Sequence, residues 1–90
     1  MIEVKLVLLH EDLRGIFGTK EVTFNLPEGS AVRDLLWMAA QKYGEKIMGI
    51  VSKAGTIIVL NGQNIEFLGG INARLSDGDR VAIIPLIDGG

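Results

Sequence analysis

The pattern of apolar and polar positions predicts two strands near the start of the chain. Apolar residues alternate with polar ones at residues 2–8 and again at residues 21–26; the apolar members are Ile2, Val4, Leu6, Leu8, Val22, Phe24 and Leu26. This period of two is typical of strands with one buried face. We therefore expect two antiparallel strands joined by a loop at residues 10–18, in which Leu13, Ile16 and Phe17 fold back over the core.

A helical period follows the strand stop at Pro27-Glu28-Gly29. Its apolar members recur at i, i+3, i+4, i+7, i+8 and i+11: Val32, Leu35, Leu36, Ala39, Ala40 and Tyr43. The pattern predicts an amphipathic helix with Ser30 as its N-cap and Gly44 at its end. Trp37 and Met38 lie off the apolar stripe, so we expect both to be only partly buried. A second short helical turn is predicted between residues 45 and 52.

The second half of the chain contains three strand signals. Residues 56–60 are rich in β-branched side chains and lead into Asn61-Gly62, which favours a two-residue hairpin, so residues 63–68 are expected to return as a short strand. Gly69-Gly70 then indicates an irregular bend, and Leu75 is expected to fill the core. A tight turn at residues 76–79 precedes the last strand.

The last strand is apolar at every position from residue 81 to residue 84, which indicates cover on both faces. The chain's own helix can cover one face, and the other is a candidate docking surface. A crossover through one helix is long enough to place a later strand parallel to the first. We predict a single α+β domain over residues 1–90, with a mixed sheet of four to five strands and one main helix on one face.

The chain ends in Ile87-Asp88-Gly89-Gly90. Glycine loses more backbone entropy on ordering than any other residue, so residues 87–90 are expected to form a flexible tail. Two residues without Cβ would let the terminal carboxylate pass through a channel that excludes side chains. The alternative is an ordinary frayed or cloning-derived terminus, since glycine makes up 12 of the 90 residues.

Composition narrows the function classes. A chain of 90 residues with 48% hydrophobic content forms one packed domain. Its net charge of −2 and scattered basic residues argue against a direct nucleic-acid partner. The absence of cysteine excludes disulfides, thiolate nucleophiles and the usual structural zinc sites. The sequence also lacks a signal-peptide pattern and the ~18-residue apolar run of a membrane span, so we expect no membrane partner and a cytoplasmic location.

No set of residues in the sequence converges on a catalytic or metal site. His10 is the only histidine and is expected at the surface. Asp77 and Asp79 flank Gly78 without the further ligands of a calcium loop, so a turn is the better interpretation. No glycine-rich phosphate loop precedes the helix. We therefore expect a protein that is not itself an enzyme and that binds no metal or cofactor.

The order of elements resembles that of the ubiquitin-like β-grasp sulfur carriers. The most specific similarity runs from Leu75 through the apolar strand to Pro85, followed by the terminal Gly89-Gly90, and residues 13–15 and 59–65 add to it. This family includes the molybdopterin synthase small subunit, the thiamine-pathway sulfur carrier and the ubiquitin-like small archaeal modifier proteins. Many molybdopterin-type members carry a second proline where this chain has Leu86, a departure that concerns the pathway more than the carrier role.

The resemblance implies that the protein is itself a substrate. An adenylating enzyme of the ubiquitin-activating type would use ATP and magnesium to adenylate the Gly90 carboxylate, and a sulfur donor would convert the acyl-adenylate to a thiocarboxylate. Gly89 would admit the terminus to the active site. The sulfur would pass to a pterin precursor in a synthase large subunit, which is the predicted pathway, or to a thiazole precursor or tRNA.

Two further roles are open at this stage. In the modifier branch of the family, the activated carboxyl group would form an isopeptide bond with a lysine of a target protein. A role of another class is a non-catalytic β-grasp binding module that uses its bare sheet face and has no chemistry at its C-terminus.

The partner interface is expected around the end of the last strand. Apolar contacts are predicted from the exposed side of the first strand and from Ile84, Pro85, Leu86 and Ile87. Arg80 and Arg14 are the predicted charged rim residues. The alternative for Ile84 and Leu86 is packing under a loop, but a sheet with one helix leaves a face uncovered, which favours the interface.

Overall fold

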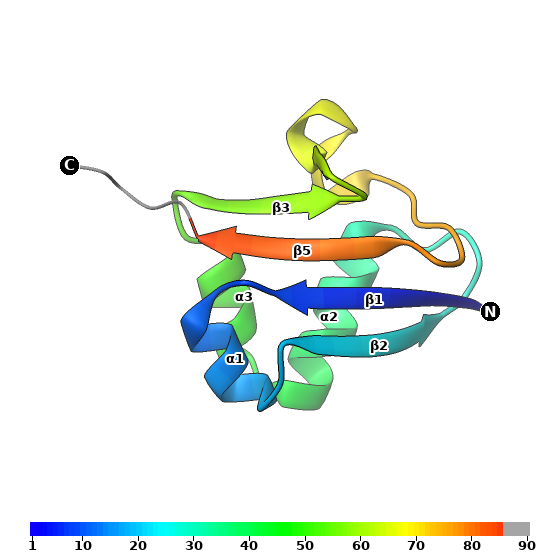
Figure 1. Cartoon of the computed structure of the whole chain (residues 1–90). Coiled ribbons are helices and arrows are strands. Elements are labelled where there is room, and N and C mark those ends of the chain that lie inside the picture. The colour runs from blue at the N-terminus through cyan, green and yellow to red at the C-terminus, as the bar shows by residue number, and fades with distance from the viewer. Residues whose placement is uncertain (86–90) are drawn as a thin grey trace.

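The computed structural model describes residues 1–85 of the chain (Figure 1). The strands in this part are β1 (Ile2–Leu8), β2 (Glu21–Leu26), β3 (Thr56–Leu60), β4 (Gln63–Asn64) and β5 (Arg80–Pro85). The α-helices are α1 (Glu11–Phe17), α2 (Val32–Tyr43) and α3 (Lys46–Val51). Two short 3-10 helices, η1 (Ile65–Phe67) and η2 (Gly70–Asn72), lie between β4 and β5.

The strands form one five-stranded mixed sheet in the order β2-β1-β5-β3-β4. β1 and β5 are parallel, and the three other neighbouring pairs are antiparallel. The predicted α+β class, the mixed sheet and the parallel placement of the last strand beside the first are therefore confirmed. The last strand in the sequence, β5, thus occupies the middle of the sheet, with β1 on one side and β3 on the other.

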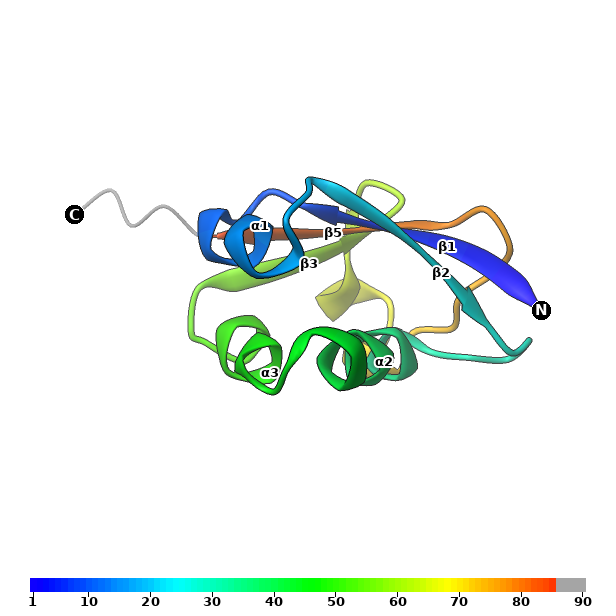
Figure 2. The same cartoon turned by 90° about the horizontal axis from the view of Figure 1, so that it is seen from below.

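Helices α2 and α3 lie side by side on one face of the sheet (Figure 2). The apolar stripe of α2 packs there against the inward side chains of the strands, and Ile47 of α3 is fully buried beside them. No helix among residues 1–85 covers the opposite face, and none is long and apolar enough to cross a membrane. The predicted main helix is thus α2, with α3 confirming the second helical turn.

The predicted loop at residues 10–18 is wrong, because most of it forms α1. His10 caps the helix, since its Nδ1 accepts the Asp12 N–H at 3.2 Å, and Gly18 ends it in the left-handed region at φ 75°. Leu13 and Phe17 are buried and Ile16 is half-buried, as expected. This short segment thus forms a helix because a side-chain cap, a C-terminal glycine and the burial of its apolar side chains all stabilise it.

The predicted N-cap of α2 is also wrong. The helix is capped at Ala31, whose N–H donates to Asp34 Oδ2 at 2.8 Å. The Ser30 hydroxyl instead donates to the Pro27 carbonyl at 2.6 Å. The predicted end at Gly44 is confirmed, since its N–H donates to the Ala40 carbonyl at 2.8 Å.

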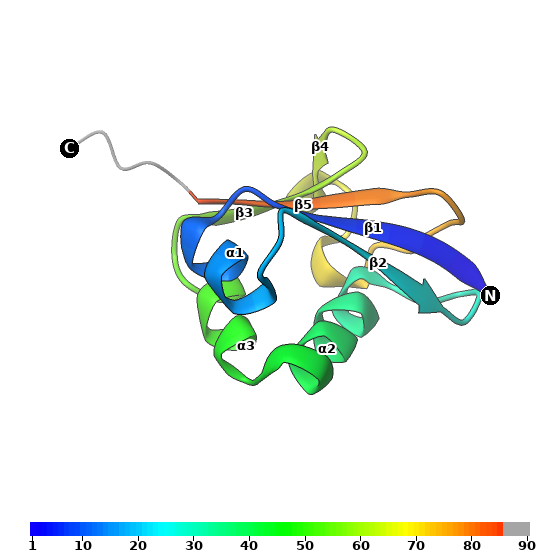
Figure 3. The same cartoon turned by 60° about the horizontal axis from the view of Figure 1, so that its bottom comes forward.

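The hairpin at Asn61-Gly62 is confirmed, but its return strand is much shorter than the predicted residues 63–68. β4 ends at Asn64, whose side-chain oxygen accepts the Glu66 N–H at 3.0 Å and so starts η1. The chain therefore turns away from β3 after two paired residues. Figure 3 shows β4 only at the end of β3 that leads into the hairpin.

The turn before β5 is confirmed and ties the start of β5 to β1. Asp79 Oδ2 accepts the Ser76 N–H at 2.7 Å, which closes the turn. Asp77 Oδ1 accepts the Glu3 N–H at 2.7 Å, and the Gly78 N–H donates to the Glu3 carbonyl at 2.8 Å. These aspartates therefore serve as turn residues, and Leu75 is buried in the core as predicted.

Candidate functional site

The open face of the sheet carries an apolar strip across its three central strands. Residues that alternate with the buried ones point to this face, and the pairing register places Val7, Ala82 and Val59 in one row across β1, β5 and β3. Ile84 of β5 lies opposite Ile57 of β3 in the next row. We call these five residues the apolar strip.

All five residues of the apolar strip are half-buried in the described part of the chain. Their neighbours within the sheet cover their flanks, but no helix lies over them. Leu9, which follows β1, is 44% exposed and prolongs the row of apolar side chains. Contiguous apolar surface of this kind marks binding sites more often than single exposed residues do. The face that the sequence predicted for docking is thus the open face, where the all-apolar strand β5 crosses the sheet, and partner binding there stays a prediction.

Charged residues border the apolar strip toward β2. Glu21 accepts a hydrogen bond from Arg80 at 3.2 Å and lies 3.6 Å from the Lys5 ammonium nitrogen. These side chains are exposed or half-exposed, so the pairs contribute only about 0–1 kcal/mol to folding. Two cations thus share one carboxylate, and Lys5 and Arg80 lie opposite each other in the register next to Val7 and Ala82. Contact of Arg80 with a partner stays a prediction.

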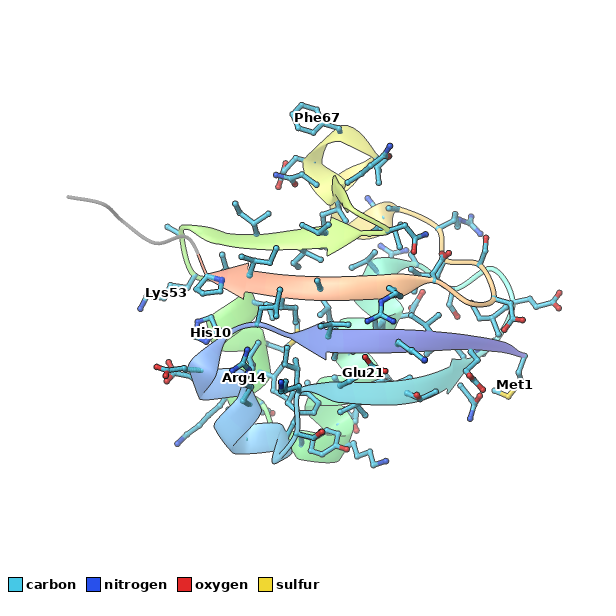
Figure 4. All side chains as sticks on the ribbon, in the orientation of Figure 1. Met1, His10, Arg14, Glu21, Lys53 and Phe67 are labelled. Atoms are coloured by element: carbon cyan, nitrogen blue, oxygen red, sulfur yellow. The ribbon has the colours of Figure 1, made fainter. Side chains whose placement is uncertain are left out.

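Arg14 lies at the end of the sheet where β5 stops, but it is tied to the protein itself. Its Nε donates to the Leu8 carbonyl at 2.8 Å and so holds α1 against the end of β1. Figure 4 shows His10 and Lys53 at the same end of the molecule. His10 is half-buried rather than a free surface residue, and Lys53 lies just before β3. The surroundings of the β5 end thus come from α1 and the α3–β3 connection.

The predicted site divides at the end of β5. Ile84 and Pro85 are half-buried, and Pro85 pairs with Thr56 at the beginning of β3. Leu86, Ile87, Gly89, Gly90 and the predicted flexible tail at residues 87–90 lie outside the described residues. The structure therefore places the part of the predicted interface that belongs to the sheet, and the reactive terminus stays a prediction.

Two strip residues, Ile57 and Val59, are absent from the predicted interface. Their signal was available in the sequence, because residues 57–60 are apolar at every position, as residues 81–84 are. Only the register between β3 and β5 shows that Ile57 and Val59 share a face with Ile84 and Ala82. Trp37, expected to be partly buried, is 63% exposed on the helical side, whereas Met38 is half-buried as expected.

The fold matches solved structures of small ubiquitin-like proteins. Small archaeal modifier protein 1 from Methanosarcina acetivorans is 29% identical, with a TM-score of 0.80 over 100% of this chain and 98% of that chain. A Pyrococcus furiosus protein described as molybdopterin converting factor subunit 1 is 24% identical, with a TM-score of 0.75 over 97% of this chain and 100% of that chain. The BexX/CysO complex from Amycolatopsis orientalis matches at 24% identity, with a TM-score of 0.79 over 97% of this chain and 99% of that chain.

Sequence comparison points in the same direction. No curated protein matches the chain significantly. The sequence profile of the ThiS family, however, matches residues 7–90, which is nearly the whole chain. The predicted β-grasp fold is thereby confirmed, and the chain belongs to the ThiS family, among the ubiquitin-like β-grasp sulfur carriers.

Proposed function

We propose that this protein carries sulfur as a thiocarboxylate on Gly90 and delivers it in molybdopterin biosynthesis. The observation that supports the proposal is the family match, which extends over the last five residues, together with a central strand that leads directly into them. The residue before this segment, Pro85, is held in the sheet by its pairing with Thr56. The protein is then a co-substrate rather than a catalyst.

The chemistry explains why an activating partner is needed. A free carboxylate is a poor acyl donor, because its leaving group would be an oxide. In an adenylating enzyme, the Gly90 carboxylate attacks the α-phosphorus of ATP, supported by magnesium, and pyrophosphate leaves. Sulfide from the donor then attacks the acyl carbon and expels AMP, and loss of the sulfur-bound proton leaves a thiocarboxylate. ATP and magnesium belong to the enzyme in this scheme, and Gly89 presents no side chain to its channel.

The apolar strip is the surface by which we propose the partner holds the body. Ile84 and Pro85, with Leu86 and Ile87 beyond them, would contact the partner next to the strip, and Arg80 would form part of its charged rim. A segment of five residues extends at most about 17 Å from the sheet. Contact at the strip therefore leaves enough chain to reach a buried active site.

The choice of pathway rests on the similarity to the Pyrococcus furiosus protein and on the sequence segment from Leu75 to Pro85. The synthase large subunit is the second partner in this proposal, because it would hold the pterin precursor that takes the sulfur. Delivery to a thiazole precursor or to tRNA would use the same activated terminus.

A second candidate function is supported by the 29% identity to the archaeal modifier protein. In that role the activated Gly90 carbonyl carbon would be attacked by a lysine amine of a target protein, and an isopeptide bond would form as the activating group leaves. Both functions require the same adenylation. They differ in the nucleophile, which is a sulfur donor in one case and a lysine amine in the other.

Intact-mass measurement separates these functions. The protein is incubated with its activating enzyme, ATP, magnesium and a sulfide source, and we expect the mass increase of one oxygen replaced by sulfur at Gly90. Addition of the large subunit and a pterin precursor should return the original mass. Conjugates with lysine-containing proteins and no sulfur form would favour the modifier. An unchanged mass with an enzyme that is active on another carrier would contradict both and leave the binding module.

A further inference from the structure

The outer edge of β3 is open over half of its length. β4 pairs only with Val59 and Leu60, and no strand within residues 1–85 pairs with residues 56–58 on that side. Figure 1 shows β3 along the upper border of the sheet, with the yellow turn of η1 above only its half near the hairpin. An open edge presents main-chain donors and acceptors to which another strand can pair.

The register shows which main-chain groups face this edge. The Asn61 N–H donates to the Arg80 carbonyl at 2.9 Å, and the direction of main-chain groups alternates along an antiparallel pair. The main-chain groups of Ile58 therefore point away from β5, toward the edge that β4 leaves open. The Thr56 N–H is used by the Lys53 carbonyl at 3.0 Å, whereas the Thr56 carbonyl also points to the open edge.

A cavity of about 160 Å³ lies along the same edge. Its apolar lining comes from the end of α3, from β3 and from both 3-10 helices; these residues are Val51, Ile57, Ile58, Ile65 and Ile71. The hollow is bordered by Asn64, where β4 ends, so it lies beside the part of β3 that a longer β4 would cover. Its volume is on the order of that of an apolar cavity that accepts benzene.

We propose that residues 56–58 of β3 bind an extended segment of a partner protein as an added strand, with one aliphatic side chain of that segment in this cavity. The main-chain groups would provide the pairing, and the cavity would select valine, leucine or isoleucine at one position. Glu66 borders the cavity and disfavours an acidic neighbour on the bound segment.

A second copy of this chain fits the cavity less well. Its own β3 could supply main-chain pairing, but the Ile58 side chain of that copy is committed to its own core, where it is only 7% exposed. A strand from the copy would therefore leave the cavity empty. A partner segment whose side chains are free satisfies both the open edge and the hollow.

This site shares only Ile57 with the apolar strip, and it adds to the proposed function. The strip lies on the open face, whereas the added strand would continue the sheet beyond β3. Strands lie about 4.8 Å apart, so the bound segment would run about 10 Å from β5 and from Pro85. A partner held there would lie close to the point where the described part of the chain ends.

The test uses the intact protein labelled with ¹⁵N and the peptide acetyl-Lys-Thr-Val-Leu-Thr-Lys-amide as probe. We expect saturable changes of the Ile58 amide signal and slower hydrogen exchange at this amide. The same peptide with N-methyl groups on alternate residues should bind at least about tenfold more weakly, because two to three main-chain hydrogen bonds are lost. Equal binding of both peptides would overturn the added strand.

Two variants test the cavity. Ile71→Asp changes a cavity wall that is 49% exposed, so the fold tolerates it, and it should weaken peptide binding by at least about tenfold. The matched control is Phe67→Asp in η1, which is 86% exposed and outside the lining, and it should bind as the parent does. Signal changes confined to the open face, or protection of Ile58 through self-association without peptide, would overturn the proposal.

Discussion

At the residue scale, a substitution at Ile84 is expected to weaken partner binding much more than folding. Its side chain is half-buried on the open face beside Ile57, so Ile84→Asp should lower the free energy of unfolding by only about 1 kcal/mol. At an interface the same carboxylate is buried without a partner, and kcat/KM for adenylation should fall more than about tenfold. The rate of pyrophosphate release measures kcat/KM for adenylation, and urea unfolding measures the free energy of unfolding.

Thr23→Asp is the matched control for Ile84→Asp. Thr23 is exposed on the same face, but it lies on the outer strand β2, across Lys5 from the apolar strip. We expect adenylation to be unchanged in this variant. Equal loss in both variants would indicate a general effect of negative charge, and no loss in either would remove the apolar strip from the partner interface.

Asn61 gives a second prediction at this scale, on stability alone. It is the only non-glycine residue with positive φ among residues 1–85, at 48°, and its side chain accepts the Arg80 N–H at 2.9 Å and donates to Asp79 at 2.9 Å. Asn61→Ala loses both bonds and keeps the left-handed backbone, so we expect a loss of about 1–3 kcal/mol in urea unfolding. Gln63→Ala, at an exposed neighbour, should change stability by less than about 0.5 kcal/mol.

The contrast between Asn61 and Ser30 shows which residues a sequence can place. Asn61-Gly62 carries its turn preference locally, and the hairpin is found where the pattern predicted it. Ser30 looks like a cap, but the Leu75 N–H donates to its carbonyl at 2.8 Å and the Val32 N–H donates to the Ala73 carbonyl at 2.9 Å. These contacts come from a segment distant in the sequence, so no local pattern contains them.

At the scale of elements, two glycines have opposite effects on the stability of α1: Gly18 favours the end of the helix, and Gly15 weakens its interior. Gly18 ends the helix at φ 75°, and a Cβ there meets nothing within 4 Å, so Gly18→Ala suffers from backbone strain alone. We expect it to lower the free energy of unfolding by about 1–2 kcal/mol. Gly15 lies inside the helix without positive φ and also has room, so Gly15→Ala should raise stability by about 0.5–1 kcal/mol.

Urea unfolding of both alanine variants checks this pair, and a loss of stability from Gly15→Ala would contradict the helical assignment of α1. The sequence missed this helix because seven residues with an internal glycine are marginal in isolation. Tertiary contacts decide the case: Leu13 and Phe17 are buried, and the Arg14 side chain bonds to the end of β1.

At the scale of the whole molecule, the sequence predicted an apolar open face of the sheet but not all of the residues that form it. The apolar run of β5 was enough to predict a strand covered on both sides, because a strand with one wet face would alternate. The contribution of Ile57 and Val59 required the register between strands far apart in the chain. The open edge of β3 was likewise hidden, since it depends on the cap at Asn64 that ends β4 early.

Folding and partner binding should not depend on the two terminal glycines, whereas the chemistry at the C-terminus should. Among residues 1–85, the core cluster is built from apolar side chains between Ile2 and Ile83, and deletion of Gly89 and Gly90 removes no side chain. We expect the free energy of unfolding to change by less than about 0.5 kcal/mol. Binding at the apolar strip should also persist, whereas thiocarboxylate formation and isopeptide formation should both be lost, because the remaining terminal Asp88 carries a side chain into the partner's channel.

The experiment combines urea unfolding, a binding measurement with the activating enzyme, and intact mass after incubation with ATP and sulfide. Asp88→Asn in the full-length chain is the control, because it changes the neighbouring side chain but keeps both glycines. A truncated protein that still supports its cellular role would assign the molecule to the binding-module class. Loss of binding together with loss of transfer would instead mean that the terminal residues, rather than the strip, hold the partner.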